Sequence, residues 1–149
     1  GGESTTLRRT GGDTTMGGSG LLPALFSHLR KTNLPVLGTC AGAILLCDPR
    51  DGREALLPAS IDRNAYGRQT DSFQDTINVS LFDGEFPGVF IRAPRFDQSS
   101  IHCKSIALHG EEVVGIMHNS RMALTFHPEL TEDCRFHVWL LQQASHSSE

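Results

Sequence analysis

The chain has 149 residues, of which 38% are hydrophobic and 20% are charged, and its formal net charge is −4. This length suffices for one hydrophobic core, so we expect a single domain that spans residues 1–149. The negative charge and an isoelectric point near 6.0 argue against a nucleic acid or an anionic membrane as partner, because both favour a basic surface. No apolar run approaches the roughly 20 residues that cross a bilayer.

The polar residues at the start of the chain, Gly1 to Thr6, do not resemble a signal peptide, and the lack of an initiator Met indicates a mature or truncated start. None of the four cysteines has the CxxC spacing of a zinc knuckle or a thioredoxin-like site. We therefore expect a cytoplasmic protein with reduced thiols, three of them buried as small hydrophobic side chains.

Along the chain, the first segment with a structural signal is the glycine-rich stretch 11–20, which predicts a loop and lacks the Gly-Lys-Ser/Thr ending of a phosphate loop. An amphipathic helix is predicted from about Ser19 to Thr32, with four apolar side chains on one face: Leu22, Leu25, Phe26 and Leu29. Ser19 can cap its start, and Asn33 followed by Pro35 ends it.

The next segment alternates between strand and helix signals. Leu34 to Gly38 is a short apolar run typical of a buried strand, and after Thr39-Cys40-Ala41-Gly42 a second apolar run covers residues 43–47. A helix, a strand and a helix in this order indicate an α/β fold. Residues 48–58 are rich in charge, Gly and Pro, which predicts a surface loop.

The second half of the chain carries strand signals followed by a final helix. Residues 77–81 alternate apolar and polar side chains, residues 88–91 form another strand-like run before Pro94, and residues 112–118 and 121–126 predict a hairpin around Asn119-Ser120. The helix is expected from Thr131, as the capping residue, to about Ala144, and residues 145–149 are expected to fray.

Cys40 lies at the predicted strand-to-helix turn between Gly38 and Gly42, which is the pattern of a nucleophile elbow. Small flanking residues allow the sharp turn, and the helix N-terminus favours a thiolate over a thiol. The backbone N–H of Ala41 is then a candidate oxyanion donor. On this segment alone, a buried Cys in a tight turn explains the pattern equally well.

Among the seven histidines, His127 stands out, because it ends an apolar strand and precedes Pro128 and Glu129. A carboxylate two residues away can hold the imidazole in one tautomer, although a His at a strand end is commonly only a turn residue. The other six have plainer explanations. Solvation accounts for His28, His118 and His146, and structural roles, without a carboxylate at suggestive spacing, account for His102, His109 and His137.

Five segments in this order carry a resemblance that covers essentially the whole chain. They are Gly1-Gly2-Glu3-Ser4-Thr5, Gly38-Thr39-Cys40-Ala41-Gly42, Arg63-Asn64-Ala65-Tyr66-Gly67-Arg68-Gln69, Phe90-Ile91-Arg92-Ala93-Pro94 and Phe126-His127-Pro128-Glu129-Leu130-Thr131. Together they closely resemble the glutaminase subunits of pyridoxal 5′-phosphate synthases, which are class I glutamine amidotransferases. The third and fourth segments point to this vitamin B6 branch.

The resemblance implies a three-layer α/β/α sandwich of the flavodoxin-like type, with the site at the carboxyl ends of the strands. It implies a triad of Cys40, His127 and Glu129, substrate contacts from six residues and two oxyanion donors. The substrate contacts are Gly2, Glu3, Ser4, Arg63, Ile91 and Arg92, and the oxyanion donors are Gly2 and Ala41. Arginine, glutamate and backbone groups suit the α-carboxylate and α-ammonium of glutamine, although an Arg taken singly is more often only a solubilising surface residue.

The implied reaction is hydrolysis of L-glutamine through a cysteine thioester, with no metal or organic cofactor, and the ammonia passes to a synthase subunit. The chain departs from the family in three places. We expect the chain to lack the N-terminal strand and helix of the family. A glycine-rich insert follows Arg9, and the connection from Cys47 to Ile61 is shorter than the family leads us to expect. Three alternatives remain: the glutaminase of another amidotransferase, a γ-glutamyl hydrolase, and a truncated, non-catalytic subunit that only binds a partner.

Overall fold

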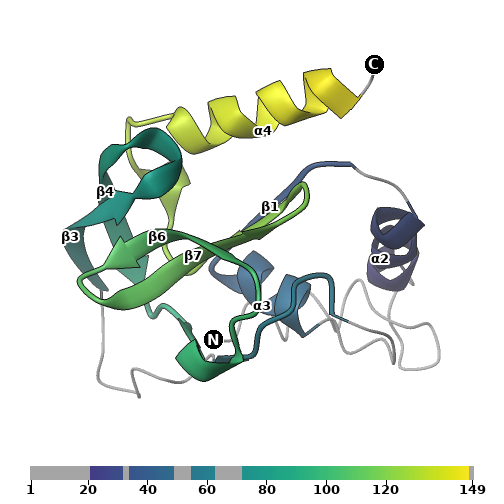
Figure 1. Cartoon of the computed structure of the whole chain (residues 1–149), viewed down its shortest axis with the longest axis horizontal. Helices are drawn as coiled ribbons and strands as arrows, with labels where there is room; N and C mark the ends of the chain where they lie inside the picture. Colours follow the sequence, from purple (N-terminus) through teal and green to yellow (C-terminus); the bar gives the residue numbers. More distant parts are fainter. Residues whose placement is uncertain (1–20, 32–33, 49–54, 63–71, 148–149) are drawn as a thin grey trace.

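The computed structural model describes residues 21–31, 34–48, 55–62 and 72–147, and its main feature is a six-stranded mixed sheet (Figure 1). The strand order is β1-β8-β7-β6-β3-β4, in which β1 and β8 are parallel and the other neighbours are antiparallel. The strands are β1 (Val36–Thr39), β3 (Ser72–Val79), β4 (Gly84–Ile91), β6 (Lys104–His109), β7 (Glu112–His118) and β8 (Arg121–Leu124). A second, two-stranded ladder pairs β2 (Ile61–Asp62) with β5 (Arg95–Phe96).

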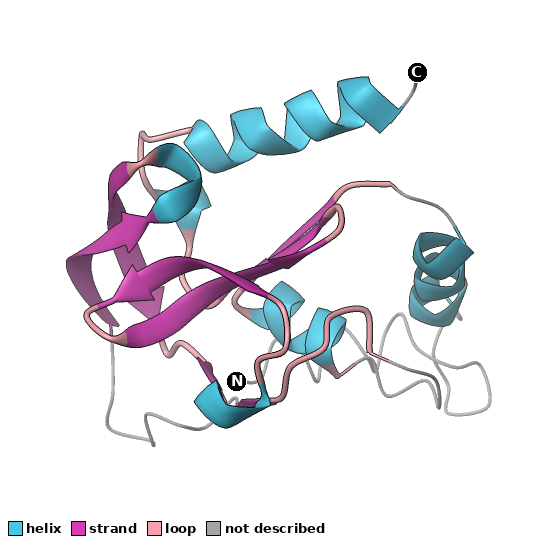
Figure 2. Cartoon of the chain, viewed as in Figure 1, coloured by secondary structure: helices cyan, strands magenta, loops and turns pink. Residues whose placement is uncertain are grey.

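Helices cover both faces of the large sheet, so the fold has three layers (Figure 2). The helices are α2 (Leu21–Lys31), α3 (Ala41–Cys47) and α4 (Arg135–Ser147), with short 3₁₀ turns η2 (Ser80–Phe82), η3 (Gln98–Ser100) and η4 (Pro128–Leu130). The expected three-layer α/β sandwich is confirmed. Among the described residues, no helix is long and apolar enough to cross a membrane.

The core on the α4 side of the sheet is aromatic. Phe86 and Phe90 of β4 and Phe126 after β8 contact one another or Phe136 of α4, with ring centroids 4.8 to 6.0 Å apart. All four rings are fully buried. Each aromatic side chain buries a large apolar area, so this cluster holds α4 and the ends of β4 and β8 in one rigid unit.

The core on the opposite face is aliphatic and holds α3. Alternation along β8 sends Met122 and Leu124 to the α4 side and Ala123 to the α3 side. Leu56 and Leu57 are buried in the same aliphatic cluster. The expected surface loop 48–58 is therefore, in its described part, an irregular segment that contributes to the core.

Arg121 ties this face together at the start of β8. Its guanidinium donates to the carbonyl oxygen of Leu56 at 3.0 Å and to that of Leu29, near the end of α2, at 2.8 Å. The carbonyl groups in the last turn of a helix lack partners within the helix, so a cation there stabilises α2.

The two edges of the sheet differ in how their backbone groups are paired. At β4, the carbonyl of Glu85 accepts from Arg135, that of Val89 accepts the N–H of His127, and Pro87 between them has no N–H to offer. At β1, the N–H of Val36 donates to the carbonyl of Ser120, just before β8, and the N–H of Cys40 donates to that of Leu124 in β8. Because backbone groups alternate in direction along a strand, the N–H and C=O groups of residues 37 and 39 point away from β8. No described residue forms a hydrogen bond with them on that side.

Several predicted elements are confirmed within the described residues. They are the helix α2, the strand β1 leading into α3, the strands β3 and β4, and the β7–β8 hairpin around residues 119 and 120. The glycine-rich stretch 11–20 and the predicted cap Ser19 lie outside the described residues.

Other expectations were wrong in detail. Helix α4 begins at Arg135 rather than after Thr131, because the Asp133 side chain accepts the Arg135 N–H and pairs with its guanidinium. Residues 145–147 are helical rather than frayed. Leu81 belongs to η2 and not to the strand before it.

Candidate active site

Cys40 joins the end of β1 to the start of α3 in a strained backbone conformation. Its φ is 49° and its ψ is −103°, whereas residues other than glycine seldom adopt a positive φ. The backbone is held there because the Cys40 N–H donates to the Leu124 carbonyl at 2.8 Å and α3 begins at Ala41. A strained residue between a strand and a helix is the geometry of a nucleophile elbow.

The two glycines that flank this elbow have different roles. A Cβ on Gly38 would lie 2.6 Å from Leu46 Cδ1 and 2.7 Å from the Gly42 carbonyl oxygen, so β1 and α3 approach closely only because residue 38 has no side chain. A Cβ on Gly42 meets nothing within 4 Å. The expectation that both flanks must be small holds for Gly38 but finds no steric reason at Gly42 among the described residues.

His127 follows β8 and is fixed at both its backbone and its ring. Its N–H donates to the Val89 carbonyl at 2.8 Å, and its Nδ1 lies 2.6 Å from Oε1 of Glu129. The imidazole is 16% exposed and the Glu129 side chain 41% exposed. Because β1 and β8 are parallel neighbours, their carboxyl ends meet, which brings His127 beside Cys40.

The electrostatics of His127 also connect the three residues. Its pKa is raised from 6.5 to about 9, first by a hydrogen bond with Cys40 and, against the opposing effect of burial, by the hydrogen bond with Glu129. At neutral pH the ring is therefore an imidazolium. With Nδ1 engaged by Glu129, Nε2 is the nitrogen left for Cys40.

The end of β4 lies against the thiol. Cys40 is only 5% exposed, and its Sγ lies 3.9 Å from the carbonyl oxygen of Ile91. Arg92 comes next, is exposed, and has a positive φ of 44°. The structure thus places Ile91, a predicted substrate contact, beside Cys40, and Arg92, a second one, follows it in the chain.

The remaining predicted site residues are only partly within the described structure. The N–H of Ala41 opens α3 and donates to no acceptor among the described residues, as expected for the first N–H of a helix. Gly2, Glu3, Ser4 and Arg63 lie outside the described residues. Asp62, which precedes Arg63, is paired with Arg95 in the β2–β5 ladder, three residues beyond Arg92.

The other cysteines lie in different environments. Cys47 is buried, and burial, together with nearby Cys103 and Asp48, raises the pKa of its thiol to about 12. Cys103 is half-buried, and burial raises its pKa. Cys134 is exposed, so the expectation of three buried structural thiols was wrong. A thiol with a raised pKa is a poor nucleophile near neutral pH.

A pair missed by sequence reasoning joins His109 of β6 to Asp75 of β3, with 2.8 Å between Nε2 and Oδ2. The ring of His109 also packs against Phe73 and Phe90. The two residues are 34 positions apart, so no local spacing could have indicated the contact. In the part of the chain that the structure describes, no group of three His, Cys, Asp or Glu side chains is arranged to hold a metal ion.

Comparisons with known proteins agree with this geometry. Residues 1–146 match the SNO glutamine amidotransferase family. The chain is 44% identical over 151 residues to a protein named pyridoxal 5′-phosphate synthase subunit PdxT of Thermococcus onnurineus, with 97% of this chain and 74% of the relative covered. It is 41% identical over 147 residues to the protein of the same name from Actinobacillus pleuropneumoniae serotype 5b, with 96% and 72% covered.

Solved structures show the same fold. A crystal structure described as a glutamine amidotransferase superposes with a TM-score of 0.73 at 37% identity and covers 85% of this chain and 69% of its own. A protein from Thermoplasma acidophilum, described as a putative GMP synthase component, is 19% identical with a TM-score of 0.61, covers 86% and 66% of the two chains, and supports the fold alone. The chain belongs to the SNO glutamine amidotransferase family.

Proposed function

We propose that the chain is the glutaminase subunit of a pyridoxal 5′-phosphate synthase and hydrolyses L-glutamine to L-glutamate and ammonia. The observation that carries the proposal is the meeting of Cys40, in a strained elbow, with the His127–Glu129 pair at the carboxyl ends of two parallel strands. The names of the relatives support the choice of synthase over another amidotransferase or a γ-glutamyl hydrolase.

In the first half of the reaction, the Cys40 thiolate attacks the side-chain carbonyl carbon of glutamine. The oxygen that becomes negative is stabilised by the N–H of Ala41, with Gly2 as the second proposed donor. The imidazolium of His127 then gives its proton to the departing nitrogen as the C–N bond breaks. Ammonia leaves, and a γ-glutamyl thioester remains on Cys40.

In the second half, the neutral His127 takes a proton from water, and the hydroxide formed attacks the thioester carbonyl. The C–S bond breaks, glutamate leaves, and the thiolate–imidazolium pair returns. Glu129 accepts a hydrogen bond from Nδ1 throughout and holds the ring in one orientation. Glu3, Ser4, Arg63, Ile91 and Arg92 are the proposed contacts to the substrate.

The proposed partner is the synthase subunit, which receives the ammonia, and the proposed compartment is the cytoplasm. Glutamine is the proposed substrate, and no nucleic acid or membrane takes part. We expect turnover to depend on this partner, because oxyanion donors act only when they are held in position, and one missing donor costs about 100- to 1,000-fold in rate.

The test is steady-state glutamate production at saturating glutamine, titrated with a pyridoxal 5′-phosphate synthase subunit. Glutamate formation that rises as this subunit is titrated in, and that is lost in Cys40→Ala, supports the proposal. Full activity without the subunit refutes the dependence on a partner. No hydrolysis by the folded chain when it is saturated with bound synthase subunit refutes the glutaminase function and favours the non-catalytic alternative.

A further inference from the structure

A hollow of about 610 Å³ lies between the β3–β4 hairpin and the segment that runs from η4 to α4. Alternation along β4 turns Pro87 and Val89 away from the aromatic core, and both line this hollow. Leu130, the last residue of η4, lines it from the other side and is 55% exposed. Together these residues form the apolar floor of a hollow whose other lining side chains are polar.

The rim of the hollow is acidic. Asp75, Glu132 and Asp133 line it, and no Lys, Arg or His of the described segments does. Arg135 pairs with Asp133, and His109 lies against Asp75, whereas Glu132 is exposed and has no ion pair among the described residues. A basic group can therefore gain an ion pair here without displacing an existing one.

The floor of the hollow also carries the backbone contacts of the candidate active site. The Val89 carbonyl accepts the His127 N–H, and Leu130 follows the Glu129 that holds the imidazole. Two residues further along β4, the Ile91 carbonyl lies beside Cys40 Sγ. A molecule bound in the hollow would thus contact the strand β4 and the turn η4, which lie against both His127 and Cys40.

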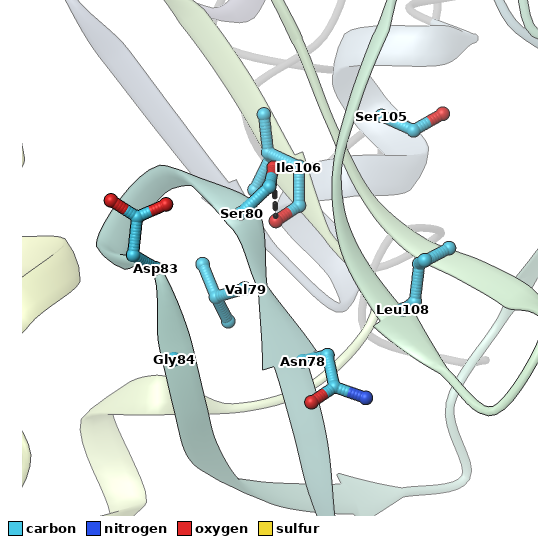
Figure 3. A pocket seen from close by; sticks show the side chains of 8 residues that line it. All are labelled: Asn78, Val79, Ser80, Asp83, Gly84, Ser105, Ile106 and Leu108. Atoms are coloured by element: carbon cyan, nitrogen blue, oxygen red, sulfur yellow. Dashed lines mark hydrogen bonds between the residues drawn. The ribbon is translucent and has the colours of Figure 1, made fainter.

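A second hollow among the described residues, of about 470 Å³, lies at the turn end of the β3–β4 hairpin (Figure 3). Of its apolar members, Val79 and Ile106 are buried and Leu108 is exposed, and Ser80 donates to the Ile106 carbonyl at 3.5 Å. No hydrogen bond or ion pair joins its lining residues to the candidate triad among the described residues, whereas Val89 of the first hollow accepts the His127 N–H.

From these observations we propose that the hollow lined by Pro87, Val89, Leu130 and Glu132 is the docking groove for the synthase subunit. Its occupant is a segment of that subunit that places apolar side chains on Val89 and Leu130 and an Arg or Lys against Glu132. The inference rests on the proposed function and adds the surface that receives the partner and the strand through which docking reaches the active site.

Two substitutions in the groove and two matched controls test the proposal. Leu130→Asp removes apolar surface and Glu132→Lys reverses the rim charge, and neither residue belongs to the triad. Leu141→Asp alters a more exposed leucine on α4, 70% exposed, and Glu111→Lys reverses an exposed charge in the β6–β7 turn. All four side chains are exposed, so thermal denaturation should show unchanged folding.

The probe is the pyridoxal 5′-phosphate synthase subunit that binds the unaltered chain. The readouts are the dissociation constant measured by calorimetry and the subunit concentration that gives half-maximal glutamate production. Each groove variant should raise both values about tenfold or more, as is usual for central interface residues, whereas the controls stay within about twofold of the unaltered chain. Binding of the Glu132→Lys variant should also depend less on salt. Turnover at saturating subunit should be unchanged.

The possible failures are distinguishable. Unaltered binding by both groove variants, while the parent chain binds, overturns the groove and leaves the glutaminase function standing. Equal weakening by the groove variants and the controls also overturns it, because the effect is then not local. If the parent chain hydrolyses glutamine but binds no synthase subunit, the proposed partner is refuted and the groove with it.

Discussion

Replacing Glu129 with Gln keeps the shape of the side chain but removes the charge that faces His127. The carboxylate lies 2.6 Å from Nδ1 and is the second favourable cause of the raised pKa of the imidazole, after Cys40. An imidazolium is the proposed acid for the leaving ammonia. The alkaline limb of the kcat profile should therefore follow the pKa of His127, near 9 in the unaltered chain.

The expected shift of the alkaline limb follows from the strength of the hydrogen bond between Glu129 and His127. A hydrogen bond to a charged group contributes roughly 1.5–3 kcal/mol, and about 1.4 kcal/mol corresponds to one pH unit. Glu129 is 41% exposed, so solvent weakens the contact and the lower value applies. We expect the alkaline limb of Glu129→Gln to lie about one pH unit lower, and kcat at its optimum to fall because the ring is less well oriented.

The measurement is glutamate production between pH 6 and 10 at saturating glutamine and synthase subunit, with Glu111→Gln as the control for loss of an exposed carboxylate. An alkaline limb at the same pH in the variant and the parent chain would refute the reasoning. Stability gives a second readout. Because the pKa of His127 is higher in the folded chain than in the unfolded chain, its protonation stabilises the fold. This contribution is complete below pH 6.5 and disappears as the pH rises through about 9. The fall in Tm over that range should be smaller in Glu129→Gln.

Three further predictions follow from the site and its supports. Cys40→Ala should abolish hydrolysis. Because Cys40 is the largest cause of the raised pKa of His127, this variant should also lower that pKa in an NMR titration more than Glu129→Gln does. A glutamine-analogue electrophile should label Cys40 before the other thiols, and equal labelling would contradict its role. Gly38→Ala should lower the free energy of unfolding by about 1–3 kcal/mol in urea denaturation, whereas Gly42→Ala should unfold like the parent; equal effects would contradict the steric argument. Arg121→Ala, which leaves two carbonyl groups without their donor, should cost roughly 2 kcal/mol in the same measurement, and no loss would show that water replaces it.

Local sequence signals were enough to predict the parts of the fold that surround Cys40. An apolar run followed by a small-residue turn predicted β1, the elbow and α3, and the Asn119-Ser120 turn between two alternating runs predicted the β7–β8 hairpin. Asn119 has a positive φ of 56°, which asparagine tolerates in tight turns. The His-Pro-Glu spacing likewise predicted the contact between His127 and Glu129, because two residues in one short turn cannot lie far apart.

Features that depend on distant residues could not be predicted in this way. The start of α4 is set by Asp133 and by the contact of Arg135 with Glu85, which is 50 positions away, whereas the local pattern favoured Thr131. Pairing of His109 with Asp75 likewise requires β6 to lie beside β3. The hollow beside η4 needs the packed positions of β3, β4 and the segment after η4, so its lining residues carry no common motif.

The unequal edges of the sheet restrict the direction in which it can grow. At β4, occupied carbonyl groups and Pro87 leave little for an incoming strand to pair with. At β1, the outward backbone groups of Leu37 and Thr39 are unpaired among the described residues. An added strand, from this chain or another, therefore finds its hydrogen-bonding partners beside the residue that precedes Cys40. Growth of the sheet at that edge alters the surroundings of the nucleophile directly and reaches the imidazole through Cys40 itself and through β8.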